Sequence, residues 1–251
     1  MLNIERLDEL RQNWGKSPHV LRAIGDQQWS IGIRDAFLRR VCGTISEKWL
    51  RVLVDGRFIF HNSLLSDRSL SLRDNTRIVS ASKLERYLKS GATVVVRGAQ
   101  SYSGSAFRLS EQLSEKFSCH ISCNLYIAEP NGIGFREHFD THHILVLQTQ
   151  GSKTWLVSPE PEMRSSKIIS VADQLCAPLG ERISFELEAG DLLYVPRGCW
   201  HSAAPGENGS THLSFGVHIP TRGENSIEKA RIQADLPENL DDLYDFEKIS
   251  K

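Results

Sequence analysis

Two histidines and one aspartate in this sequence have the types and spacing of a metal site. His138 and Asp140 are two positions apart, and on a strand such residues point to the same face. His201 follows the apolar run 192–195 and a bend at 196–198, so it can arrive from a neighbouring strand. Two histidines and one carboxylate leave one side of an ion open, which is typical of non-haem iron(II). An isolated H-x-D pair is common on protein surfaces, so the interpretation depends on the surrounding residues.

Lys153 is a candidate ligand for the co-substrate of such a metal. It follows Gly151 and Ser152 and precedes Trp155. A dianionic 2-oxo acid that chelates a metal through its 2-oxo acid end needs a cation at its far carboxylate, and a lysine in a barrel wall supplies one. Without the metal ligands, a solvated lysine in a hairpin would be the default interpretation.

The residues from Gly91 onward predict a barrel or sandwich of antiparallel strands. Short apolar, β-branched runs alternate with turns that contain glycine or proline, the pattern of such folds. A helical pattern interrupts them at 105–117. The expected strands are 93–97, 121–128, 138–140, 144–150, 154–157, 183–187, 192–195 and 211–217.

The first ninety residues mix helical and strand patterns. Apolar residues recur at helical spacing in 4–14, 31–41 and 82–88. Asp55-Gly56 predicts a hairpin between 49–54 and 57–60, and the polar stretch 61–77 predicts an irregular loop. We expect three parts: an N-terminal helical or mixed segment (1–90) packed on a barrel (91–220), and a short polar C-terminal tail or helix (221–251).

Composition and charge argue against several classes of protein. The formal net charge is −1 at pH 7, which gives no field to recruit nucleic acid or a membrane surface. No apolar run is long enough to span a membrane, and the charged N-terminal residues do not resemble a secretory signal, so we expect a cytoplasmic protein. The five cysteines are an odd number and predict free, buried thiols. A zinc site at 119–123 is disfavoured because no second ligand pair has the required spacing.

Taken together, these motifs resemble the JmjC-type branch of the cupin 2-oxoglutarate oxygenases, particularly the ribosomal-oxygenase-like group. The resemblance implies a mainly β fold with flanking helices, namely a double-stranded β-helix (jelly-roll or cupin) core with an N-terminal α/β annex. It extends from about Gly91 to Pro220 and is carried by the segments 124–126, 130–134, 138–140, 151–155, 190–196 and 200–201.

The resemblance also implies roles for individual residues. It assigns iron(II) to His138, Asp140 and His201, and the distal carboxylate of 2-oxoglutarate to Lys153. Further co-substrate ligands would be Tyr126, Asn124 and Ser214.

Two further positions, 142 and 216, lie beside the implied site. If the strand continues beyond Asp140, His142 shares its face, and we expect it to contact substrate rather than to be a fourth metal ligand. Gly216 departs from the family pattern because it stands about where a co-substrate-binding serine can occur.

The implied reaction is hydroxylation of a C–H bond with release of succinate and carbon dioxide. We expect the substrate to be an amino-acid side chain, of histidine or arginine type, in a peptide or protein; a small metabolite or free amino acid is the alternative. Lysine demethylation ranks below both, because nothing resembles a chromatin-reading module. The resemblance is compatible with a homodimer. However, 221–251 is too short for the winged-helix domain of the known ribosomal oxygenases, which weakens the expectation of a ribosomal substrate and of their dimer interface.

Two other classes of function remain open. In a metal-dependent cupin that does not use 2-oxoglutarate, His142 or His143 could add a ligand, but Lys153 would have no role. A non-catalytic barrel that only binds a ligand is the third class, and the intact H-x-D and distal histidine argue against it.

Overall fold

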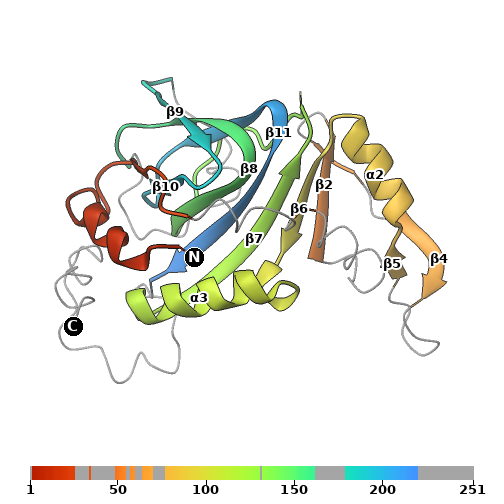
Figure 1. The fold of residues 1–251 in the computed structure, drawn as a ribbon. Coiled ribbons are helices and arrows are strands. Elements are labelled where there is room, and N and C mark those ends of the chain that lie inside the picture. The colour runs from red at the N-terminus through yellow and green to blue at the C-terminus, as the bar shows by residue number, and fades with distance from the viewer. Residues whose placement is uncertain are drawn as a thin grey trace, which may run out of the picture.

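The computed structural model describes residues 2–25, 34, 49–54, 57–59, 64–69, 77–130, 132–161 and 179–219. Its main feature is a curved, antiparallel nine-stranded sheet (Figure 1), in the order β1-β10-β8-β11-β7-β6-β2-β3, with β9 paired to β8. The bounds are β1 His19–Leu21, β2 Leu50–Val54, β3 Arg57–Phe58, β6 Thr93–Arg97, β7 His120–Ala128, β8 His143–Val157, β9 Ile183–Glu188, β10 Leu192–Val195 and β11 His201–His218. The expected mainly β architecture is confirmed.

Helix α3 (Gly104–Phe117) covers one side of the strands, as Figure 1 shows. It begins at Ser103, whose side chain accepts a hydrogen bond from the Ala106 amide, a typical N-cap. Its apolar face buries Leu109, Leu113 and Phe117. The predicted helix at 105–117 is therefore confirmed, and it places a rigid wall beneath β7.

The N-terminal residues are integrated into the sheet. The helix expected at 4–14 is a 3-10 helix, η1 (Ile4–Gln12), which buries Leu7 and Leu10. Trp14 stacks between Phe117 and Tyr194, with ring centroids 5.0 and 4.8 Å away. β1 then pairs with β10, so this segment closes one edge of the sheet.

The part of the chain before β6 confirms two expectations and contradicts one. β2 and β3 form the predicted hairpin, and α2 (Ala81–Lys89) is the predicted helix at 82–88. The loop expected at 61–77 is wrong for the described residues, because β4 (Leu65–Ser69) pairs with β5 (Arg77–Val79). Apart from the helical Arg34, the helix expected at 31–41 lies outside the described residues, and so does the tail 221–251.

The two longest strands, β8 and β11, differ from the prediction in one respect. Strands were expected at 144–150 and 154–157 with a turn between them, but β8 runs through Gly151 without reversing. The register of β11 against β8 shifts between Pro205 and Ser210. Gly151 has φ +64° and lies against Gly209, which has φ +72°. Two glycines thus accommodate an irregularity in a continuous ladder, and Lys153 stands within a strand rather than in a hairpin.

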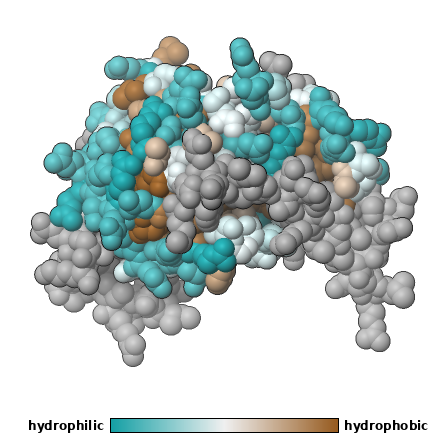
Figure 2. Space-filling view, in the orientation of Figure 1, coloured by the Kyte–Doolittle hydropathy of each residue, from teal (hydrophilic) through white to brown (hydrophobic). Residues whose placement is uncertain are grey.

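Side chains divide between core and surface as expected for a globular chain. Figure 2 shows a face that is mostly hydrophilic, with small hydrophobic patches. Of the described cysteines, Cys119 and Cys123 are free thiols. Cys123 and Cys199 are buried, as predicted, whereas Cys119 is only half-buried. Burial raises the pKa of Cys119 to about 11, which makes it a poor nucleophile.

In the described part of the chain, no helix is both long and apolar enough to cross a membrane.

Candidate metal centre

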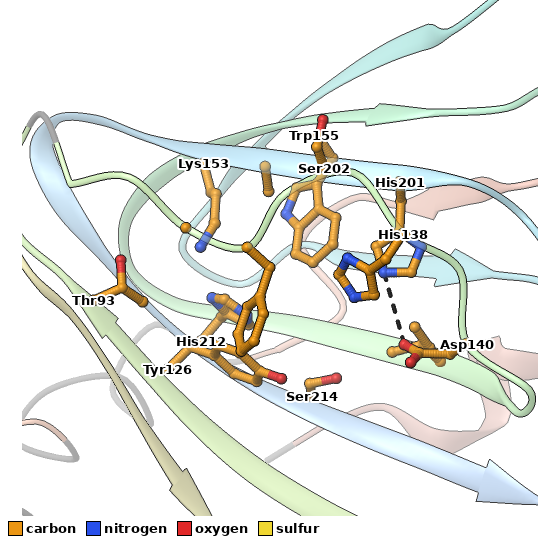
Figure 3. A pocket seen from close by; sticks show the side chains of 14 residues that line it. Thr93, Tyr126, His138, Asp140, Lys153, Trp155, His201, Ser202, His212 and Ser214 are labelled. Atoms are coloured by element: carbon orange, nitrogen blue, oxygen red, sulfur yellow. Dashed lines mark ion pairs between the residues drawn. The ribbon is translucent and has the colours of Figure 1, made fainter. Parts of the chain in front are cut away.

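His138, Asp140 and His201 meet at one point in the barrel. One ligand atom from each lies within 4.8 Å of the others. Nε2 of His201 is 3.7 Å from a carboxylate oxygen of Asp140, the contact drawn as a dashed line in Figure 3. The structure therefore brings together the three residues proposed from the sequence. Two imidazoles and one carboxylate suit iron(II) and related divalent ions.

The segment that carries His138 and Asp140 is held by hydrogen bonds to the start of β11. The amide of His138 donates to the carbonyl of His201 at 3.0 Å, and the reciprocal bond is 2.7 Å long. The amide of Gly198 donates to the carbonyl of Asp140 at 2.9 Å. The strand expected at 138–140 is thus wrong: the structure has a single bridge between His138 and His201, and the chain bends directly after Asp140.

The orientation of both imidazoles is fixed by backbone carbonyls. Nδ1 of His138 lies 2.8 Å from the carbonyl oxygen of Arg136, and Nδ1 of His201 lies 3.0 Å from that of Cys199. A carbonyl only accepts, so each Nδ1 must donate, and each Nε2 keeps its lone pair for a metal. Glu137, next to His138, forms an ion pair with Arg182 at the start of β9.

The protonation states also favour metal binding. Burial, followed by the charge of His138, lowers the pKa of His201 to about 4, so His201 is neutral near pH 7. Burial alone would raise the pKa of Asp140. Four neighbouring imidazoles, of which His201 acts most strongly, outweigh burial and hold the pKa of Asp140 below its usual range. A neutral imidazole and an ionised carboxylate are the forms that bind metal.

Lys153 lies in the same pocket, at the end away from Asp140 (Figure 3). It is 4% exposed, and burial lowers its pKa to about 8. No acidic side chain in the described part of the chain forms an ion pair with it. The pocket is lined by Thr93, Tyr126, Gly134, Phe135, His138, Asp140, Ile144, Lys153, Trp155, His201, Ser202, Ala203, His212 and Ser214.

The other predicted co-substrate ligands have different positions. Tyr126 and Ser214 line the pocket. Asn124 does not; its side chain accepts a hydrogen bond from the Gly98 amide at 3.3 Å. Burial, followed by the Asp140 carboxylate, raises the pKa of Tyr126, which keeps its hydroxyl protonated.

His142 and Gly216 lie together outside the pocket lining. Because the chain bends after Asp140, His142 does not continue the strand face of the metal ligands. Its ring lies 4.4 Å from that of His218. A Cβ at Gly216 would approach Nε2 of His142 to 2.8 Å. Gly216 thus makes room for the imidazole.

His212 is a polar pocket residue that was not among the site residues expected from the sequence. It is 1% exposed and stacks on Tyr126, with centroids 4.6 Å apart. The sequence did contain a signal for its position. His212 and Ser214 are two positions apart on one strand, so His212 shares the face of a predicted co-substrate ligand.

Comparison with known proteins agrees with this geometry. The JmjC domain family matches residues 98–225. Bifunctional lysine-specific demethylase and histidyl-hydroxylase NO66 of Drosophila grimshawi is 32% identical over 160 residues, covering 60% of this chain and 22% of that protein. The Aedes aegypti protein of the same name is 33% identical over 139 residues, covering 53% of this chain and 21% of that protein. The chain thus spans about a fifth of the length of these relatives.

Two solved structures share the fold at low sequence identity. Escherichia coli ycfD has a TM-score of 0.59 and 18% identity, covering 94% of this chain and 60% of that one. The structure of YcfD, a ribosomal oxygenase, in complex with cobalt and 2-oxoglutarate has a TM-score of 0.55 and 18% identity, covering 94% and 59%. Because the family model matches more than half of its residues, with His138, Asp140 and His201 inside the matched region, this chain belongs to the JmjC domain family.

Proposed function

We propose that the chain is an iron(II)- and 2-oxoglutarate-dependent oxygenase that hydroxylates an amino-acid side chain, of histidine or arginine type, in a peptide or protein. His138, Asp140 and His201 would hold the iron, and Lys153 would bind the distal carboxylate of the co-substrate. When bound, iron and 2-oxoglutarate supply the activation of dioxygen, and the co-substrate becomes succinate and carbon dioxide while a C–H bond becomes C–OH.

One observation carries this proposal: a buried lysine, with no acidic partner among the described residues, shares one pocket with His138, Asp140 and His201. A buried cation without a counter-charge is unfavourable, so Lys153 points to an anionic ligand. A ligand with a carboxylate at one end and a metal-chelating group at the other satisfies both ends of the pocket. A cupin that does not use 2-oxoglutarate would leave Lys153 without a role.

The protein's own part in the reaction is to bind the metal and the co-substrate and to hold them in a fixed orientation. The carbonyls of Arg136 and Cys199 fix the two imidazoles, and Trp155 and the Tyr126 ring form apolar walls between metal and lysine. No side chain is needed as a proton donor or acceptor, because the oxidised bond is a C–H bond.

The substrate class is supported by the relatives. The two NO66 proteins are named as histidyl hydroxylases, and we extend that activity to this chain as part of the proposal. Peptides containing histidine or arginine are therefore the first to screen, by the mass increase of one oxygen atom.

An anaerobic titration of the iron(II)-loaded protein with 2-oxoglutarate tests the proposal. We expect the visible charge-transfer band of a 2-oxo acid chelated to iron. The band should be absent in His138→Ala, and Lys153→Ala should need at least about tenfold more co-substrate. Iron binding without a band in the wild-type protein would refute the use of 2-oxoglutarate.

A further inference from the structure

Two polar side chains in the pocket wall have no hydrogen-bond partner among the described residues. They are Trp155, at its indole Nε1, and His212, at both ring nitrogens. Trp155 is 7% exposed and His212 is 1% exposed. Buried polar groups are nearly always hydrogen-bonded, so two unpaired groups in one pocket wall point to a ligand that pairs with them.

Both side chains lie next to Lys153. Its Nζ is 5.8 Å from the centre of the Trp155 ring, and the Trp155 and His212 rings are 5.6 Å apart and nearly perpendicular, at 76°. Figure 3 shows nitrogen atoms of all three side chains facing the same space, at the end of the pocket away from Asp140. Tyr126 supports this arrangement by stacking on His212 at 7° between planes.

The chemistry of these groups selects the ligand. An indole N–H can only donate. Burial, followed by the charge of Lys153, lowers the pKa of His212, so its imidazole is neutral and donates from one nitrogen. A carboxylate only accepts and has two oxygens with several lone pairs. One ammonium and two neutral donors around one space therefore match a carboxylate.

We propose that Trp155 and His212 are specificity-determining residues that donate hydrogen bonds to the distal carboxylate of the co-substrate, on either side of Lys153. This inference rests on the proposed function and extends it: the pocket discriminates a 2-oxo dicarboxylic acid from a 2-oxo monocarboxylic acid by three donors rather than one. Neither residue was assigned this role by the sequence, and neither contributes to holding the metal.

Calorimetric titration of the zinc-loaded full chain separates the two ends of the pocket. 2-Oxoglutarate and 2-oxobutanoate share the metal-chelating end, but only the first has a distal carboxylate. Trp155→Phe and His212→Phe keep an aromatic ring and remove the donors. We expect each variant to raise the dissociation constant for 2-oxoglutarate about tenfold or more, as for the loss of a hydrogen bond to a charged group, and to leave that for 2-oxobutanoate unchanged.

Three further samples control the experiment. Trp49→Phe makes the same chemical change outside the pocket and should bind both acids as the wild type does. His212→Gln restores an N–H donor and should recover part of the 2-oxoglutarate affinity. Lys153→Met should weaken binding of 2-oxoglutarate at least as much as either aromatic variant.

The outcomes are distinguishable. If wild-type protein binds zinc but not 2-oxoglutarate, the proposed function fails. If it binds 2-oxoglutarate in a Lys153-dependent manner and neither aromatic variant weakens that binding, the inference is overturned while the proposed function stands. Equal loss of both 2-oxo acids in the variants would also overturn it, because that result means a packing role.

Discussion

His138 and His201 are joined by two reciprocal backbone hydrogen bonds, 3.0 and 2.7 Å long, so each ligand-bearing segment holds the other in place. The two imidazole centroids lie 4.4 Å apart before any ion is added. The site is therefore organised by the fold, and metal binding need not order the chain.

Metal binding should accordingly appear as added stability rather than as folding. An ion that binds only the native state at about a hundredfold excess over its dissociation constant adds about 2.7 kcal/mol. For a chain of this size we expect a rise of about 5 °C or more in the melting temperature on adding zinc. Differential scanning calorimetry, with circular dichroism of the metal-free protein, measures both parts.

His138→Ala and His201→Ala should lose this rise but keep the circular dichroism of the wild-type protein. His19→Ala, on β1, is the matched control and should retain the full rise. A metal-free wild-type protein without β structure would contradict a preorganised site.

Lys153 should lower the stability of the ligand-free protein near neutral pH. Its pKa falls from 10.5 to about 8 on folding because of burial, so between these values the unfolded chain binds more protons than the native one. Stability linked to this group therefore increases as the pH rises from about 8 to 10.5. Lys153→Met should be more stable than wild type at pH 7 by up to about 3 kcal/mol.

Urea unfolding of both proteins at pH 7 and pH 10 checks the sign. The advantage of the Met variant should shrink at the higher pH, and the comparison between variants cancels the titration of other groups. Lys83→Met, on helix α2, makes the same chemical change outside the pocket and serves as the matched control. A constant advantage across this range would mean that Lys153 is not a buried cation.

Gly151 should tolerate no side chain. A Cβ there would lie 2.1 Å from the carbonyl oxygen of Gly209, and the residue has φ +64°. We expect Gly151→Ala to lower the free energy of unfolding by about 3 kcal/mol. Gly104→Ala is the matched control, because a Cβ at the start of α3 would meet only the Arg108 side chain, at 3.7 Å.

Urea denaturation of the two glycine variants compares them directly. Gly104→Ala should match or slightly exceed the wild-type stability, since alanine is favoured over glycine in a helix. Equal stability of Gly151→Ala and wild type would mean that β8 and β11 do not approach each other closely at this point.

The sequence was sufficient for the parts of the fold whose signal is local. The β-branched run Thr93–Arg97 and the helical spacing of apolar residues in α3 each specify their element within a few residues. The spacing in residues 4–14 also identified a helix, but apolar residues at these intervals fit a 3-10 helix as well as an α-helix. The packing of η1 against the rest of the fold decides which of the two helix types forms.

Other features depend on residues far apart in the chain. A glycine such as Gly151 is equally compatible with a turn and with an irregular strand, and its pairing with Gly209 decides the outcome. The H-x-D pair pointed to two side chains that the structure brings together with His201, yet the backbone of this pair is set by its bridge to His201 and not by its own strand propensity. His212 was overlooked because its meaning comes from the lysine and tryptophan it faces on β8.

The pairing of β1 with β10 has a consequence for how the chain acquires its structure. His19 lies opposite Tyr194, and the Gly15 amide donates to the Tyr194 hydroxyl at 2.8 Å. During synthesis the first strand must therefore wait until most of the chain has emerged before it finds its partner, and contacts of such long sequence separation slow folding. The apolar face of Trp14 stays uncovered during that interval, so we expect chaperones to bind this segment before β10 is made.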